Sequence, residues 1–88
     1  METRVAYALH AVKIRPECLV RFVDGWQPPN GLELRAALSM AGWNCEEFAR
    51  CVGVGGRSAR RWVLDECPIP FAAWCILAAK AGFGELWV

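Results

Sequence analysis

The densest cluster of positive charge in this 88-residue chain lies in one short stretch. Arg57, Arg60 and Arg61 follow one another closely, and no acidic residue lies between Arg57 and Asp65. At helical spacing, Arg57 and Arg61 are one turn apart and share a face. The planar fork of arginine can bond O6 and N7 of a guanine together, and a helix fits the major groove of double-stranded DNA. We therefore predict a DNA-binding helix whose Arg57 and Arg61 face the bases.

The residues around this face are expected to support the same contact. Arg60 is rotated away from the other two arginines, which favours a contact with a phosphate. Ser58 lies at the start of the predicted helix, where its hydroxyl can cap the helix or bond a phosphate. Gly55 and Gly56 carry no side chains, so the helix N-terminus can approach the duplex closely and offer backbone amides to a phosphate.

The composition is typical of a single domain without a general affinity for nucleic acid. Hydrophobic residues make up 56% of the chain and include five tryptophans, which is enough apolar surface for a core at this length. The net charge is only +1, so DNA binding must come from the local cluster. The N-terminus has no signal-peptide pattern, and the apolar run at 69–79 is shorter than the about 20 residues that span a bilayer. We expect a cytoplasmic protein with no membrane contact.

The remaining reactive side chains form no pattern typical of a catalytic or metal site. The five cysteines include no C-x-x-C pair, and the single His10 is far from the others in sequence. Cys45, Cys51 and Cys75 fall in helical, apolar surroundings, where a free thiol behaves as a small hydrophobe, and we predict buried structural thiols there. Since no nucleophile–base arrangement or phosphate-binding loop is present, we expect no enzyme activity, metal, cofactor or small-molecule ligand.

Residues 31–88 have the period of an α-helical domain. Asn44 and Glu47 are spaced for a capping box, and glycines follow the apolar stripes as helix ends. These signals predict four helices, at about 32–41, 45–52, 57–63 and 70–81, followed by an apolar tail. Because the second and third are short and joined by a glycine-containing turn, they are typical of a helix-turn-helix unit.

Residues 1–30 differ in pattern and form an N-terminal extension with a connector. Apolar residues alternate up to Ile14, and Pro16 stands in a turn before the apolar run 18–23. Two strands joined at Pro16 fit this pattern, and so does a helix over 3–13. The β-branched residues favour the hairpin.

The stretch from Gly31 to Gly82 resembles the lambda-repressor-like (Xre/Cro) helix-turn-helix family. A first helix is followed by EEFAR, VGV and RSARRW in the family's order and spacing. The segments 69–74 and 81–87 also resemble small helix-turn-helix proteins of filamentous phages and prophages. The resemblance implies a mainly α, four-helix domain that regulates transcription from a phage or another mobile element.

The resemblance also implies roles for single residues. The family's base-reading positions fall on Gly56, Arg57 and Arg61, and its phosphate contact at the start of the second helix falls on Cys45. This chain departs from the pattern at two of these positions. Gly56 has no side chain with which to read a base, and Cys45 replaces the usual polar residue.

Surplus apolar surface predicts a homodimer, and family members bind as dimers to half-sites about 34–36 Å apart. The segment 5–23 is slightly favoured as the dimer contact over the tail 83–88, because it is longer. A second class of function stays open, a protein-interaction module on the same scaffold that binds a host or phage protein. The clustered arginines favour DNA, whereas the near-neutral charge favours the protein partner.

Overall fold

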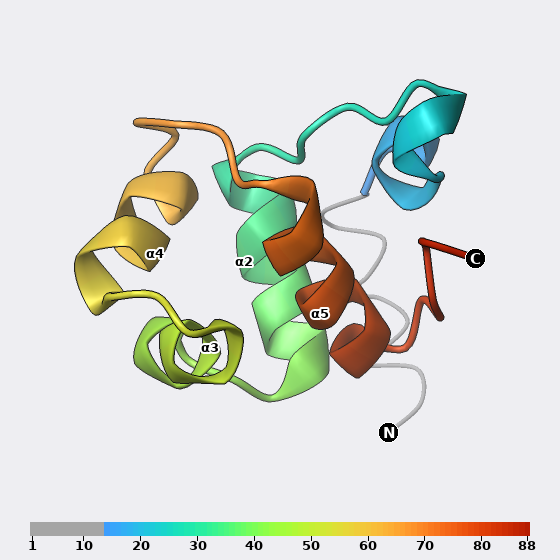
Figure 1. The fold of residues 1–88 in the computed structure, drawn as a ribbon. Helices are drawn as coiled ribbons and strands as arrows, with labels where there is room; N and C mark the ends of the chain where they lie inside the picture. Colours follow the sequence, from blue (N-terminus) through green and yellow to red (C-terminus); the bar gives the residue numbers. More distant parts are fainter. Residues whose placement is uncertain (1–13) are drawn as a thin grey trace.

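The computed structural model describes residues 14–88, and this part of the chain is helical throughout its regular elements (Figure 1). The four α-helices are α2 (Gly31–Ala41), α3 (Cys45–Val52), α4 (Gly56–Val63) and α5 (Phe71–Ala81). Two short 3-10 helices precede them, η1 (Pro16–Leu19) and η2 (Phe22–Asp24). Since no strand occurs between residues 14 and 88, the predicted mainly α, four-helix architecture is confirmed.

Side-chain caps fix the starts of α2 and α3. Asn44 accepts a hydrogen bond from the Glu47 amide at 2.8 Å, and the Glu47 carboxylate accepts one from the Asn44 amide at 2.9 Å, which confirms the predicted capping box. Asn30 and Glu33 form a second box, so α2 begins one residue earlier than predicted. Glycines in the left-handed conformation end three of the helices at the predicted positions, Gly42, Gly53 and Gly82.

The core lies between α2 and α5, and α3 and α4 pack against this pair (Figure 1). Leu34 of α2, Phe48 of α3 and Trp74 of α5 are among its largest fully buried side chains. Phe48 also meets the ring of Trp62 on α4 edge to face, with the ring centroids 6.0 Å apart. This aromatic contact fixes the orientation of α4 relative to α3.

The segment before α2 folds back onto the core, although the sequence predicted a strand there. Pro16 opens η1, because proline fixes φ in the helical range and lacks only an amide that a first turn leaves unpaired. Cys18 is fully buried, and its carbonyl accepts the indole N–H of Trp74 at 2.6 Å and that of Trp26 at 3.1 Å. The second strand of the predicted hairpin, 18–23, is therefore wrong. The predicted first strand up to residue 13 and the alternative helix over 3–13 lie outside the described residues.

A buried carboxylate joins this segment to α2. Glu33 is 2% exposed and accepts hydrogen bonds from the Arg15 amide and Nε at 2.9 Å each, from Arg15 Nη2 at 3.0 Å and from the Asn30 amide at 2.7 Å. Burial alone would raise the pKa of Glu33, but these hydrogen bonds outweigh it and hold the pKa below its ordinary value. Burial, and then the charge of Glu33, raises the pKa of the adjacent Cys18 thiol to about 11.

The loop between α4 and α5 is fixed to the start of α2. Asp65 accepts the Gly31 amide at 2.8 Å while its own backbone adopts a left-handed φ of 63°. A Cβ at Gly31 would overlap the carbonyl oxygen of Val63, so the close approach of these segments depends on glycine. This contact sets the position of the residues that follow α4.

None of the helices between residues 14 and 88 has the length and hydrophobicity that crossing a bilayer requires.

Candidate nucleic-acid interface

A tight turn joins α3 to α4. Gly53 ends α3 with a φ of 80°, and Gly55 is the residue before α4, so the connection is three residues long. The helix begins at Gly56, one residue earlier than predicted, and no side chain caps it. Ser58 is exposed in the first turn without capping the helix, which leaves a phosphate contact as its predicted role. The first amides of α4 therefore have no side-chain partner.

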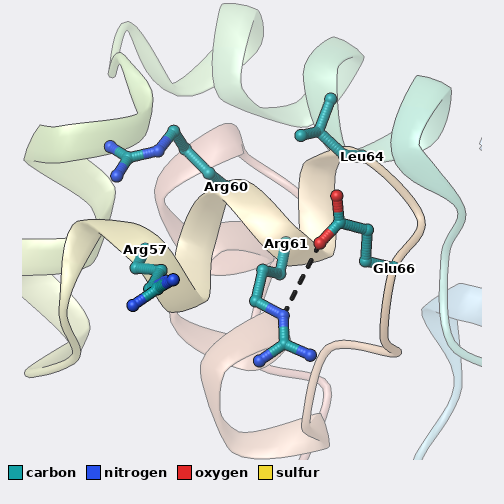
Figure 2. A pocket seen from close by; sticks show the side chains of 5 residues that line it. All are labelled: Arg57, Arg60, Arg61, Leu64 and Glu66. Atoms are coloured by element: carbon teal, nitrogen blue, oxygen red, sulfur yellow. Dashed lines mark ion pairs between the residues drawn. The ribbon is translucent and has the colours of Figure 1, made fainter.

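The two faces of α4 differ sharply in burial. Ala59 and Trp62 are buried against the core, as their spacing predicted. The side chains of Arg57, Arg60 and Arg61 are all exposed. Figure 2 shows the guanidinium of Arg60 directed away from those of Arg57 and Arg61. All three arginines therefore lie on the solvent-facing side of α4, with Arg57 and Arg61 in one group and Arg60 pointing elsewhere.

Gly56, Arg60 and Cys45 lie near one another at the side of α4 that faces α3. A Cβ at Gly56 would lie 3.3 Å from Nη1 of Arg60, so the guanidinium of Arg60 lies over the start of α4. Cys45 is the first residue of α3 and is half-buried. Burial raises the pKa of the Cys45 thiol, and the positive charge of Arg60 opposes that shift. Arg60 therefore adds positive charge to the start of both helices of the unit.

An open hollow of about 640 Å³ lies along α4 (Figure 2). It is lined by the three arginines, by Leu64 and by Glu66. Glu66 comes after the helix, and its carboxylate lies 3.6 Å from Nε of Arg61. The sequence indicated no functional role for Glu66. Glu66 follows Arg61 by five residues in the sequence, just beyond the end of the helix. This spacing is the sequence signal from which the ion pair could have been predicted.

The prediction that Cys45, Cys51 and Cys75 are buried is confirmed only in part. Cys75 is buried and Cys45 is half-buried, but Cys51 is exposed, so the prediction is wrong for Cys51. Its side chain lies off the face of α3 that carries Phe48 and Ala49 into the core. Within residues 14–88, no three His, Cys, Asp or Glu side chains gather as metal ligands would.

These features define the class of the molecule, a helix-turn-helix protein with an arginine-bearing second helix. Comparison with known proteins gives its family. Two proteins of Escherichia coli, each named transcriptional repressor protein KorC, are similar to this chain. One is 46% identical over 79 residues, covering 86% of this chain and 92% of the relative. The other is 42% identical over 77 residues, covering 84% and 89%.

The chain therefore belongs to the family of KorC transcriptional repressor proteins. No protein-family profile matches the chain, and no solved structure matches it.

Proposed function

We propose that this protein is a transcriptional repressor that binds double-stranded DNA sequence-specifically through α4. The observation that carries the proposal is the set of three exposed arginines on the second helix of a helix-turn-helix unit, in a chain whose relatives are named transcriptional repressors. Arginine is the side chain best suited to bidentate contacts with guanine and with phosphate.

In this proposal, the residues of the unit divide the contact between bases and backbone. Arg57 and Arg61 read base edges in the major groove, and Arg60 bonds a phosphate. The exposed hydroxyl of Ser58 and the start of α3 at Cys45 lie toward the phosphate backbone, while Gly56 lets α4 approach the duplex. Membership of the lambda-repressor-like (Xre/Cro) group, an origin in a phage or another mobile element and a cytoplasmic location belong to the same proposal. The spacing of the helix-turn-helix unit supports the first of these.

The direct test is replacement of single arginines after the preferred site has been selected from a random duplex library. Arg57→Ala should weaken binding to that site by about 1–3 kcal/mol, roughly 5- to 150-fold, and relax the preference at one base pair. Arg60→Ala should weaken all duplexes alike and reduce the salt slope by about one. Fluorescence anisotropy against the site and its single-base variants measures both.

Arg21→Ala is the matched control for these variants. Arg21 is an exposed arginine paired with Asp24 at 2.8 Å, between η1 and η2 and away from α4 (Figure 1). The Arg21→Ala substitution removes one positive charge, as each arginine variant of α4 does, and we expect it to leave the preference for the selected site unchanged. An Arg57→Ala variant with wild-type affinity and preference would show that α4 is not the recognition helix.

We also propose that the protein acts as a homodimer, because two base-reading arginines give one protomer little sequence information. Apolar residues that a second copy would cover gather where η2, α5 and the tail meet. Phe22 and Trp26 each contact Phe71 of α5, and Trp87 of the tail lines an open hollow of about 370 Å³ beside it. The hollow is lined by apolar residues and Cys75.

Light scattering on the full chain tests the dimer. Trp87→Ala should convert a dimer to a monomer and weaken binding to a paired site far more than to a half-site. A wild-type monomer at high concentration would contradict the dimer. In that case the same apolar face would favour the second candidate function, binding of a host or phage protein.

A further inference from the structure

We infer that Glu66 is a specificity-determining positioning residue, which holds the side chain of Arg61 so that its two terminal nitrogens face a guanine. This inference rests on the proposed DNA-binding function. Glu66 Oε1 lies 3.6 Å from Nε of Arg61, and both side chains line the hollow beside α4 (Figure 2).

The backbone fixes Glu66 relative to α4. The Glu66 amide donates a hydrogen bond to the carbonyl of Arg61 at 2.8 Å, directly behind the side chain that Glu66 meets. The preceding residue, Asp65, is bonded to the Gly31 amide at the start of α2. The carboxylate of Glu66 is thus attached to a loop that is held at both the helix end and the neighbouring helix.

The chemistry of the guanidinium explains why the contact at Nε matters. Arginine offers five N–H donors in a rigid plane, and a carboxylate near Nε leaves donors on both Nη1 and Nη2 available. Those two nitrogens match O6 and N7 of guanine. Because a free arginine side chain loses substantial rotamer entropy when it is ordered, a carboxylate that restrains it beforehand lowers the cost of binding.

The exposure of the Arg61–Glu66 pair indicates that it contributes little to the stability of the fold. Both side chains are 55% exposed, and ion pairs of this kind contribute little to folding. Once DNA displaces the surrounding water, the attraction between Glu66 and Arg61 strengthens. A carboxylate without this role would only repel phosphates, and its removal would improve binding to every duplex equally.

The test is Glu66→Gln in the full chain, measured on the selected site and on duplexes altered at the base pair that Arg61→Ala relaxes. We expect Glu66→Gln to reduce discrimination at that base pair by about two- to fivefold and to leave the other positions unchanged. In the Arg61→Ala background, Glu66→Gln should have no further effect on discrimination, since the two residues act as a unit. Glu17→Gln, which removes an exposed carboxylate on η1, is the matched control.

Three results would overturn the inference. The first is an equal rise in affinity for all duplexes in Glu66→Gln, which would mean that Glu66 only repels phosphate. The second is unchanged discrimination while Arg61→Ala still relaxes one base pair, which leaves the proposed function intact. The third is an Arg61→Ala variant with wild-type affinity and preference, in which case the assignment of Arg61 as a base-reading residue fails as well. An unchanged melting temperature in Glu66→Gln shows that altered folding is not the cause.

Discussion

The protein contains two arginine–glutamate pairs that differ in nearly every physical respect. Arg15 and Glu33 meet through Nε and Nη2 at 2.9 and 3.0 Å, and the carboxylate is buried. Arg61 and Glu66 lie 3.6 Å apart, and both side chains are more than half exposed. The first pair joins the segment before α2 to the core, whereas the second borders the hollow beside α4.

The difference shows how a fold separates structural charge from charge that is available for binding. Glu33 receives four hydrogen bonds from Arg15 and the Asn30 amide, and Arg15 also donates to the carbonyl of Pro28 at 3.0 Å. The carboxylate therefore has little capacity left for a ligand. Arg61 has one distant partner and keeps most of its donors free. An arginine of this second kind can bind DNA without first breaking the fold.

The largest expected effect concerns the Arg15–Glu33 pair, whose carboxylate is buried. Glu33→Ala should lower the free energy of unfolding by about 2–4 kcal/mol, because it removes the charged hydrogen bonds with Arg15 together with the Glu33 half of the capping box of α2. Glu66→Ala should change it by less than about 0.5 kcal/mol. Urea unfolding followed by tryptophan fluorescence measures both. Similar losses of unfolding free energy in Glu33→Ala and Glu66→Ala would show that the two ion pairs do not differ in their contribution to stability.

A smaller effect is expected at Gly31, where the two regions touch. Gly31→Ala should destabilise by about 1–3 kcal/mol although alanine favours helix, because the new Cβ would overlap the Val63 carbonyl and push the loop that carries Glu66. Gly56→Ala is the matched control, since it is also the first residue of its helix and would meet only the flexible end of Arg60. We expect it to be nearly neutral in thermal unfolding. If Gly31→Ala were equally neutral, the loop between α4 and α5 would not be packed tightly against the start of α2.

The smallest expected effect is a dependence of stability on pH. The pKa of Glu33 is lower in the folded protein than its ordinary value of 4.5, so the carboxylate stabilises the fold above that pH and loses this contribution as the pH falls through the folded value. The Cys18 thiol beside it, with its pKa raised to about 11, stays neutral throughout this range. The difference in melting temperature between wild type and Glu33→Gln should shrink as the pH is lowered from 6 to 3. A difference that stays constant would contradict the role of the ionised carboxylate.

Much of the helical framework follows from local sequence. Asn44 and Glu47 predicted the start of α3, and three glycines predicted the ends of α2, α3 and α5, because caps and left-handed residues act within a few positions of the chain. The exposed face of α4 was equally readable, since helical spacing alone separates Arg57 and Arg61 from Ala59 and Trp62. For the same reason, the sequence indicated which helix to consider for DNA.

Only the tertiary structure decided the contacts between residues that are far apart in the sequence. Pattern alone favoured a strand over residues 18–23, but the indole groups of Trp26 and Trp74 hold the Cys18 carbonyl in a 3-10 turn, and Trp74 is 56 residues away. Arg15 meets Glu33 across 18 residues, and the loop after α4 sets Glu66 beside Arg61. Local chemistry fixes where helices begin and end, whereas burial and ion pairing depend on which helices come into contact, and that is determined by the whole chain at once.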